Sequence, residues 1–250
     1  MKKPADPLLS FPTVCKRDQV RSRREVRRQL AQPIAAAAIG IITPGCEIYG
    51  LTKGAFSLVD IIVACLAQTG PADVVVSSWT AAGSDISFAN QLLTDGRICS
   101  LRFIMDYSFQ TRQPAYCAAL LERFGAGAIR ATKTHAKFVL ITNEKWNISV
   151  RTSMNLNENR RMENFEISDD AGLMAYLMGF VEEVFSAPLG GFNFKQTYKE
   201  NARDFEKLGE DITSAEAAAR VDKLAPGYFG EGSLDRDLRR IGFSTDSGRL

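Results

Sequence analysis

Two kinds of apolar run alternate through the middle of the chain, and this alternation constrains its fold more than any other feature. Short continuous runs rich in β-branched residues predict strands, whereas longer runs with apolar residues three and four positions apart predict helices. The predicted strands span residues 46–54, 72–80, 98–108, 128–143 and 146–154, and the predicted helices span residues 57–69, 84–96, 114–125 and 169–187. Strands that alternate with helices indicate an α/β sandwich, with a sheet between helical layers.

The two flanks of this region differ from it in composition. Residues 1–35 are polar and include one predicted basic helix at 17–31, while the last 60 or so residues mix aromatic with charged side chains around a short predicted helix at 213–224. Changes of this kind along a chain mark domain boundaries. We therefore expect a basic N-terminal arm at 1–35, a central α/β domain at 36–190 and a C-terminal helical appendage at 191–250.

The cysteines and the lengths of the apolar runs exclude several classes of protein. The five cysteines are scattered and have no C-x-x-C spacing, which argues against a disulfide framework or a zinc knuckle and favours a reducing compartment. The longest apolar stretches, 34–43 and 61–67, fall short of the roughly 20 residues that a spanning helix needs. Prolines and an aspartate interrupt the N-terminal stretch that a secretory signal would occupy, so we expect a cytoplasmic protein without membrane contact.

Positive charge is concentrated near the N-terminus. The formal net charge of the chain is +2, but residues 16–28 carry seven Lys or Arg against two acidic residues, a local balance of +5. A cluster of this kind neutralises phosphates and indicates nucleic-acid binding, although a solvated helix face with paired charges is an alternative interpretation. The candidate nucleic-acid contacts in this cluster are Arg23, Arg24, Arg27 and Arg28.

The stretch THAKFVLITNEKWNISVRTSMNLNENRRMENFEI, residues 134–167, contains the single histidine of the chain, His135. One histidine excludes a metal site built on several imidazoles, and we expect no metal and no cofactor. Imidazole, with an ordinary pKa of about 6.5, is neutral at working pH and is a strong nucleophile once desolvated. Lys137 follows two positions later, a spacing that places both side chains on one face of a predicted strand.

Later polar residues of the same stretch can supply the remaining groups of a phosphodiester site. Ser153 and Asn155, at the end of the next predicted strand, are hydrogen-bond donors for phosphoryl oxygens that gain charge in the transition state. Glu163 is a candidate acceptor for the second ring nitrogen of His135, which would fix the tautomer and stabilise an imidazolium. Glu166 is the alternative carboxylate for this role.

The order of these residues resembles the signature of the phospholipase D superfamily, H-x-K-x4-D followed after a return strand by G-S-x-N. The resemblance covers the order of elements from 46 to 187, and residue identities mainly from 134 to 167. It implies a phospholipase D-like mixed β-sheet between helices and a metal-independent phosphodiesterase that acts through a covalent phosphohistidine. The catalytic residues that it implies are His135, Lys137, Ser153, Asn155 and Glu163.

The resemblance also implies a homodimer. Superfamily members with two motif copies build one site from both, and members with a single copy bring two chains together across a two-fold axis. In this chain His135 would be the nucleophile, and the partner subunit's His135 would protonate the leaving oxygen and then activate water. The basic arm favours a nuclease that acts on DNA or RNA.

Two positions depart from the family pattern. Thr142 stands where the family has its aspartate, and Thr152 stands where it has the glycine before the serine. A nucleic-acid-binding member of the fold without turnover is therefore an alternative, and so is a phospholipid hydrolase or phosphatidyltransferase, which would need an exposed apolar surface.

Three further residues lie near the motif or near a strand end. Arg160 and Arg161, between two motif elements, are candidate contacts to a backbone phosphate. Trp79 lies at the carboxyl end of the predicted strand 72–80, where site loops of α/β sheets occur, but we expect it in the buried core.

Overall fold

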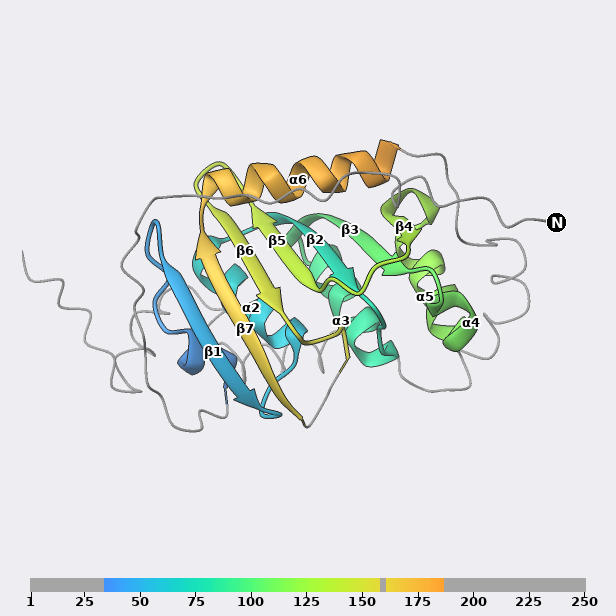
Figure 1. The fold of residues 1–250 in the computed structure, drawn as a ribbon, viewed down its shortest axis with the longest axis horizontal. Helices are drawn as coiled ribbons and strands as arrows, with labels where there is room; N and C mark the ends of the chain where they lie inside the picture. Colours follow the sequence, from blue (N-terminus) through green and yellow to red (C-terminus); the bar gives the residue numbers. More distant parts are fainter. Residues whose placement is uncertain (1–33, 158–160, 187–250) are drawn as a thin grey trace, which may run out of the picture.

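The computed structural model describes residues 34–157 and 161–186 of the 250-residue chain, and within them a sheet between helices (Figure 1). The strands are β1 (Glu47–Lys53), β2 (Ala72–Ser78), β3 (Ile98–Asp106), β4 (Ile129–Thr132), β5 (Phe138–Thr142), β6 (Asn147–Thr152) and β7 (Met162–Asp169). The helices are α1 (Ala35–Ile39), α2 (Leu58–Thr69), α3 (Gly83–Thr94), α4 (Phe109–Arg112), α5 (Pro114–Phe124) and α6 (Ala171–Ser186), with a 3-10 turn at Ala126–Ala128.

The seven strands form one mixed sheet in the order β1-β7-β6-β5-β2-β3-β4. The neighbours β2, β3 and β4 run parallel, and all other neighbouring pairs run antiparallel. Helices connect β1 to β2, β2 to β3 and β3 to β4, as parallel crossovers require, whereas a tight hairpin joins β5 to β6. The mixed sheet predicted from the sequence is confirmed.

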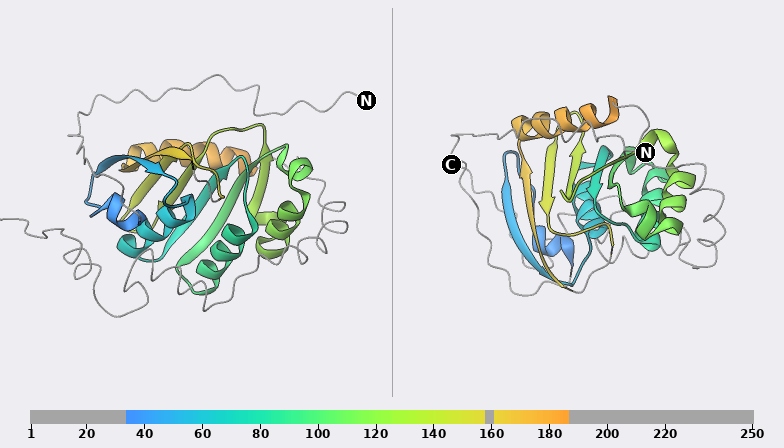
Figure 2. Two further views of the ribbon diagram at one scale, coloured as in Figure 1. Left: turned by 90° about the horizontal axis from the view of Figure 1, so that it is seen from below. Right: turned by 45° about the vertical axis from the view of Figure 1, so that its right-hand side comes forward.

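Helices cover the two faces of the sheet unequally. The long helix α6 lies across one face, and α1 to α5 lie against the other (Figures 1 and 2). Alternate residues of β5 point to opposite faces of the sheet. Phe138 and Leu140 pack with Met174 and Val181 of α6. Val139 belongs to the larger core under the other helices. Burial on both faces explains why β5 is a continuous apolar run rather than an alternating one.

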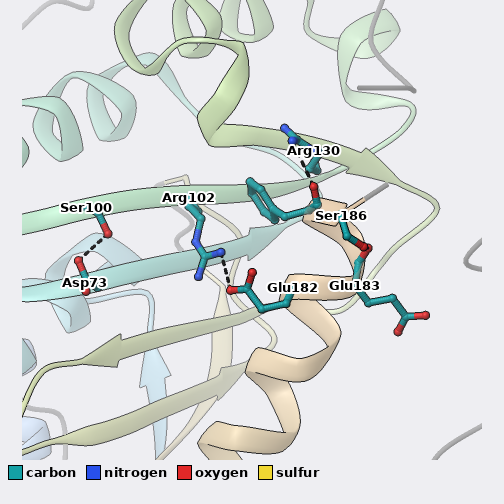
Figure 3. Close-up of polar contacts among 8 residues, drawn as sticks. Asp73, Ser100, Arg102, Arg130, Glu182, Glu183 and Ser186 are labelled. Atoms are coloured by element: carbon teal, nitrogen blue, oxygen red, sulfur yellow. Dashed lines mark hydrogen bonds and ion pairs between the residues drawn. The ribbon is translucent and has the colours of Figure 1, made fainter. Parts of the chain in front are cut away.

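Polar contacts attach the C-terminal end of α6 to the sheet (Figure 3). Arg102 of β3 forms an ion pair with Glu182 at 2.7 Å. Arg130 of β4 donates from Nη2 to the carbonyl oxygen of Phe185 at 3.3 Å. The guanidinium groups of Arg102 and Arg130 lie 5.1 Å and 4.7 Å from the centre of the Phe185 ring. These contacts fix the helix that closes one face of the sheet.

Several predicted boundaries are confirmed by local geometry. The helix predicted at 57–69 is α2, and Ser57 caps it through a reciprocal hydrogen-bond pair with Asp60. The helix predicted at 84–96 is α3, which ends at Thr94, with Gly96 in the turn beyond it at φ 68°. The long helix predicted at 169–187 corresponds to α6.

One predicted strand is wrong, and one strand of the sheet was not predicted. Residues 128–143 form two separate strands: β4 lies at the sheet edge beside β3, and β5 lies between β2 and β6. Residues 133–137 cross from the edge to the centre, and this crossing has no hydrophobic signature. Strand β7 was not predicted, because its alternating polar and apolar residues follow a charged stretch and half of its side chains remain partly exposed.

The basic arm and the C-terminal appendage lie outside the described residues, so their predicted structure stays a prediction. Among the helices that the structure describes, none is long and apolar enough to cross a membrane.

Candidate active site

The motif residues meet at one end of the sheet because neighbouring strands run in opposite directions. Strand β2 ends here, β5 begins beside it, β6 ends beside β5, and β7 begins beside β6. The register pairs Ser77 of β2 with Phe138 of β5, and Phe138 with Arg151 of β6. Thr152, the last residue of β6, pairs with Phe165 of β7. Residues just before β5, just after β6 and at the start of β7 are thereby neighbours.

The segment that carries His135 and Lys137 is tied to the strands on both sides of it. Ser77 donates from its buried hydroxyl to the carbonyl oxygen of Ala136 at 2.9 Å. On the other side, the backbone N–H of Thr152 donates to the carbonyl oxygen of Lys137 at 3.2 Å. The prediction that both motif residues lie on a strand is wrong, since β5 begins at Phe138. The backbone of the segment is nevertheless held in place.

Lys137 and His135 are in direct contact. The Nζ atom of Lys137 lies 3.3 Å from each ring nitrogen of His135, and it donates to the carbonyl oxygen of His135 at 2.9 Å. The imidazole is exposed, whereas Lys137 is buried. Burial lowers the pKa of Lys137, and the negative charge of Glu163 opposes that shift. The contact therefore combines a solvent-accessible imidazole with a partly desolvated ammonium group.

Ser153 and Glu163 form a second hydrogen-bonded pair at this end of the sheet. The hydroxyl of Ser153 donates to Oε2 of Glu163, and it accepts a hydrogen bond from the backbone N–H of Asn164 at 3.0 Å. The backbone N–H of Ser153 also donates to the carbonyl oxygen of Asn164 at 3.2 Å. Glu163 of β7 therefore accepts a hydrogen bond from the serine of the motif, and its charge acts on Lys137. The alternative carboxylate, Glu166, forms an ion pair with Arg151 at 2.8 Å.

Asn155 is fixed against the end of β2. Its side-chain oxygen accepts a hydrogen bond from the backbone N–H of Trp79 at 3.3 Å. The next residue, Leu156, receives a hydrogen bond at its carbonyl oxygen from Ala82 at 2.8 Å, and its own N–H donates to the hydroxyl of Ser78 at 3.0 Å. With the amide oxygen fixed in this way, the NH₂ group is the part of the Asn155 side chain that can donate to an anion.

Trp79 is a neighbour of His135, and its prediction as a buried core residue is wrong. Its side chain is partly exposed, and its ring packs edge-to-face with the imidazole at a centroid distance of 5.8 Å. The guanidinium of Arg112 stacks on the same indole, with Cζ 3.5 Å from the ring centre. The sequence contained one signal for Trp79, its place at the carboxyl end of a strand. Arg112 had no signal, because α4 is a single short turn.

The basic residues assigned to nucleic acid are mostly beyond the described part of the chain. Arg161 is exposed and immediately precedes β7. Five others lie outside the described residues, namely Arg23, Arg24, Arg27, Arg28 and Arg160. Their assignment stays a prediction.

No set of side chains suited to a metal ion was found in the described residues: no three His, Cys, Asp or Glu groups gather within reach of one ion. The groups at the candidate site are an imidazole, an ammonium, a hydroxyl, an amide and a carboxylate. The first four of these groups can bind or attack an anion, and the carboxylate can accept hydrogen bonds from them.

Comparison with known proteins gave matches among solved structures only. No family model and no curated protein matches the sequence. NucT from Helicobacter pylori is similar at a TM-score of 0.43 and 14% identity, covering 56% of this chain and 96% of that chain. Nuc from Salmonella typhimurium, a phospholipase D family member, has a TM-score of 0.41 and 16% identity, covering 56% and 93%. Phosphatidylserine synthase from Haemophilus influenzae has a TM-score of 0.42 and 13% identity, covering 71% and 47%. The chemistry proposed below rests on the motif residues and their geometry.

Proposed function

We propose that this protein is a metal-independent phosphodiesterase that cleaves DNA or RNA through a phosphohistidine intermediate. The observation that carries the proposal is the contact between the exposed His135 and the buried Lys137, at 3.3 Å from both ring nitrogens. The contact places a positive charge next to the proposed nucleophile, where it can stabilise the charge that develops on the phosphoryl oxygens. Ser153, Asn155 and Glu163 lie at the same end of the sheet.

The reaction has two displacements at phosphorus. A ring nitrogen of His135 attacks the phosphodiester, a P–N bond forms, and the P–O bond to the leaving alcohol breaks as that oxygen takes up a proton. Water then attacks the phosphohistidine, gives its proton to a base, and releases the phosphomonoester with free His135. Lys137 and the amide NH₂ of Asn155 stabilise the charge that develops on the phosphoryl oxygens.

A second imidazole is needed for the two proton transfers, and it comes from a second copy of the chain. The sequence holds one histidine, so a two-fold homodimer would bring the partner subunit's His135 to the leaving oxygen. In light scattering, we expect active protein to have twice the mass of one chain. Full activity in a monomer at high dilution would contradict the shared site.

The preference for nucleic acid rests on charge. The run of seven Lys or Arg at 16–28 and the exposed Arg161 favour a polyanionic strand. A phospholipid substrate would instead need an apolar interfacial surface near the site. Activity on phospholipid vesicles with no activity on DNA or RNA would reverse the assignment.

The test of the chemistry is hydrolysis of bis-p-nitrophenyl phosphate in excess EDTA. Wild-type protein should release p-nitrophenol, and His135→Ala should reduce the rate by a factor of 10³ or more, about the loss expected for a covalent nucleophile. After incubation with a radioactively labelled phosphodiester, the wild-type protein should carry a covalent label that acid removes. The His135→Ala protein should carry no such label. A strict requirement for added divalent metal would contradict the proposal.

A nucleic-acid-binding protein without turnover is the second candidate, favoured by Thr142 at the family's aspartate position. Thr142 is the last residue of β5, whereas His135 and Lys137 precede its first residue. The threonine at the family's aspartate position therefore lies at the opposite end of β5 from His135 and Lys137, which supports an intact reaction centre. Binding of DNA without cleavage, unchanged by His135→Ala, would identify this second candidate.

A further inference from the structure

Arg112, the last residue of α4, presents an ordered guanidinium group beside the candidate active site. Its Cζ atom lies 3.5 Å from the centre of the Trp79 ring, a stacking distance. Its Nη2 atom donates to the carbonyl oxygen of Trp79 at 2.7 Å, and its Nε atom donates to the hydroxyl of Ser108 at 2.9 Å. Nevertheless the residue is exposed, so the remaining N–H groups can reach a ligand.

The anchoring of Arg112 extends into the sheet. Ser108 donates from its hydroxyl to the carboxylate of Asp106, the last residue of β3, and its backbone N–H donates to the same oxygen at 2.9 Å. A free arginine side chain loses rotamer entropy when a ligand immobilises it. Because this guanidinium is already stacked and hydrogen-bonded, much of that cost does not arise on binding.

Trp79 joins Arg112 to the nucleophile. The indole contacts the guanidinium at 3.5 Å and the His135 imidazole at a centroid distance of 5.8 Å. The separation between the guanidinium and the imidazole is therefore at most the sum of those two distances. When one phosphate of an extended strand lies at His135, the next phosphate of that strand is therefore within reach of Arg112.

The charge of Arg112 is available to an anion. In residues 34–157 and 161–186, the oxygens that accept its hydrogen bonds belong to a carbonyl and a hydroxyl, and Asp106 is reached only through that hydroxyl. A guanidinium with free N–H edges binds phosphate in a bidentate manner. One of its two faces is occupied by Trp79, and the free N–H edges that remain match the geometry of a phosphate.

We infer that Arg112 binds a second phosphate of the substrate, adjacent to the phosphate that His135 attacks. This inference rests on the proposed function, and it makes the substrate class a strand with consecutive phosphodiesters rather than a molecule with one. Arg112 is then a residue that determines specificity for nucleic acid, and it contributes little to a small single-phosphodiester substrate.

A binding experiment tests Arg112 without turnover. In a His135→Ala background, the affinity for a fluorescent single-stranded oligonucleotide is measured by anisotropy across a salt series. Arg112→Ala should weaken binding at low salt by tenfold or more, and should reduce the slope of log K against log salt by about 0.7, the value for one phosphate contact. The matched control is Lys145→Ala, which removes an exposed cation 5.2 Å from the Trp146 ring in the β5–β6 hairpin. An unchanged slope in Arg112→Ala overturns the inference.

A kinetic comparison separates substrate contact from positioning. In the otherwise wild-type protein, Arg112→Ala should lower kcat/KM for the oligonucleotide at least tenfold more than it lowers kcat/KM for bis-p-nitrophenyl phosphate. Arg112→Lys keeps the charge and should therefore retain the salt slope of the wild type. This variant replaces Arg112→Ala in the comparison if Arg112→Ala is poorly folded. An equal loss on both substrates would mean that Arg112 acts only through Trp79, and would overturn the inference. Absence of turnover in the wild type would refute the proposed function while the binding experiment still tests Arg112.

Discussion

Lys137 is buried and yet its Nζ atom lies 3.3 Å from both ring nitrogens of the exposed His135. A buried ammonium group loses hydration that one neighbouring imidazole and one carbonyl oxygen only partly replace. The chain therefore carries a local cost to stability at the position where the proposed chemistry needs a cation. Trade-offs of this kind are typical of functional sites.

The first prediction concerns that cost. Lys137→Met keeps the apolar stem and removes the charge, so we expect the free energy of unfolding at pH 7 to rise by about 0.5–2 kcal/mol. Phosphodiesterase activity should fall by at least a factor of 100, since the cation at the phosphoryl oxygens is lost. Urea denaturation and bis-p-nitrophenyl phosphate hydrolysis measure the two effects.

The stability difference between Lys137→Met and the wild type should change with pH in a direction set by the pKa shift of Lys137. The pKa of Lys137 is lower in the folded state than in the unfolded state, so the unfolded chain binds more protons between the two values and this lysine adds stability as pH rises. The stability advantage of Lys137→Met should accordingly shrink between pH 7 and pH 10. A stability advantage of Lys137→Met that stays constant over this range would contradict the assignment.

The second prediction separates the two glutamates of β7. The negative charge of Glu163 raises the pKa of Lys137 against the effect of burial. In Glu163→Gln, which keeps a side-chain oxygen for Ser153 to donate to, the pKa of Lys137 should fall further. The alkaline limb of the pH–rate profile should therefore move to lower pH, with a tenfold to hundredfold lower rate at its optimum.

Glu166→Gln is the matched control for that prediction. Glu163 and Glu166 are three residues apart on one strand, so their side chains point to opposite faces, and Glu166 pairs with Arg151 at 2.8 Å. Its substitution should leave the alkaline limb unchanged. A shift of equal size in both variants would show that general charge, rather than the neighbour of Lys137, sets the profile.

Local signals predicted the helices well. The Ser57 cap, the turn at Gly96 and the apolar periodicity of α2 and α6 all act within a few residues, so the sequence carries them directly. Spacing alone could not place β4 and β5, because both have strand-like composition and only the crossing of residues 133–137 separates them. The strand order depends on distant pairings such as Ser77 with Phe138.

For the candidate site too, residues close together in sequence were predicted, and residues that reach the site through distant contacts were not. The motif predicted His135, Lys137, Ser153, Asn155 and Glu163 because they occur in order within one stretch, and the structure brings them to one end of the sheet. Trp79 was assigned to the core and Arg112 was not considered, since their contacts with the site arise from strands and turns distant in sequence. A tryptophan at a strand end cannot be told from a core tryptophan by composition.

The third prediction concerns a buried hydroxyl pair between β6 and β7. Ser149 and Ser168 are both buried and their Oγ atoms lie 2.8 Å apart. Ser149→Ala removes one partner and leaves the other hydroxyl buried, so the free energy of unfolding should fall by about 1–3 kcal/mol. Replacing both serines with alanine should cost less than the two single changes added together, which urea denaturation of all four proteins measures. Additive losses would mean that the hydroxyls do not depend on each other.

The last prediction concerns the close approach of Gly50 to Phe165 across β1 and β7. The two residues pair directly in the sheet, and a Cβ at Gly50 would lie 2.2 Å from Cζ of the Phe165 ring. The ring is buried and packs edge-to-face with Phe56 at a centroid distance of 6.0 Å, so it has little room to move. Gly50→Ala should therefore lower the free energy of unfolding by about 1–3 kcal/mol, the usual cost of overpacking.

Two further variants make the Gly50 prediction specific. Gly127→Ala, at a glycine with no neighbouring atom within 4 Å of its would-be Cβ, should change stability by no more than about 0.5 kcal/mol. Gly50→Ala combined with Phe165→Leu should be more stable than the sum of the two single changes predicts, because the shorter side chain relieves the clash. Glu163 lies two residues from Phe165 on β7, so a displaced strand should also lower activity in Gly50→Ala and recover part of it in the double variant. Strict additivity in both stability and activity would show that the strand absorbs the methyl group without moving the ring.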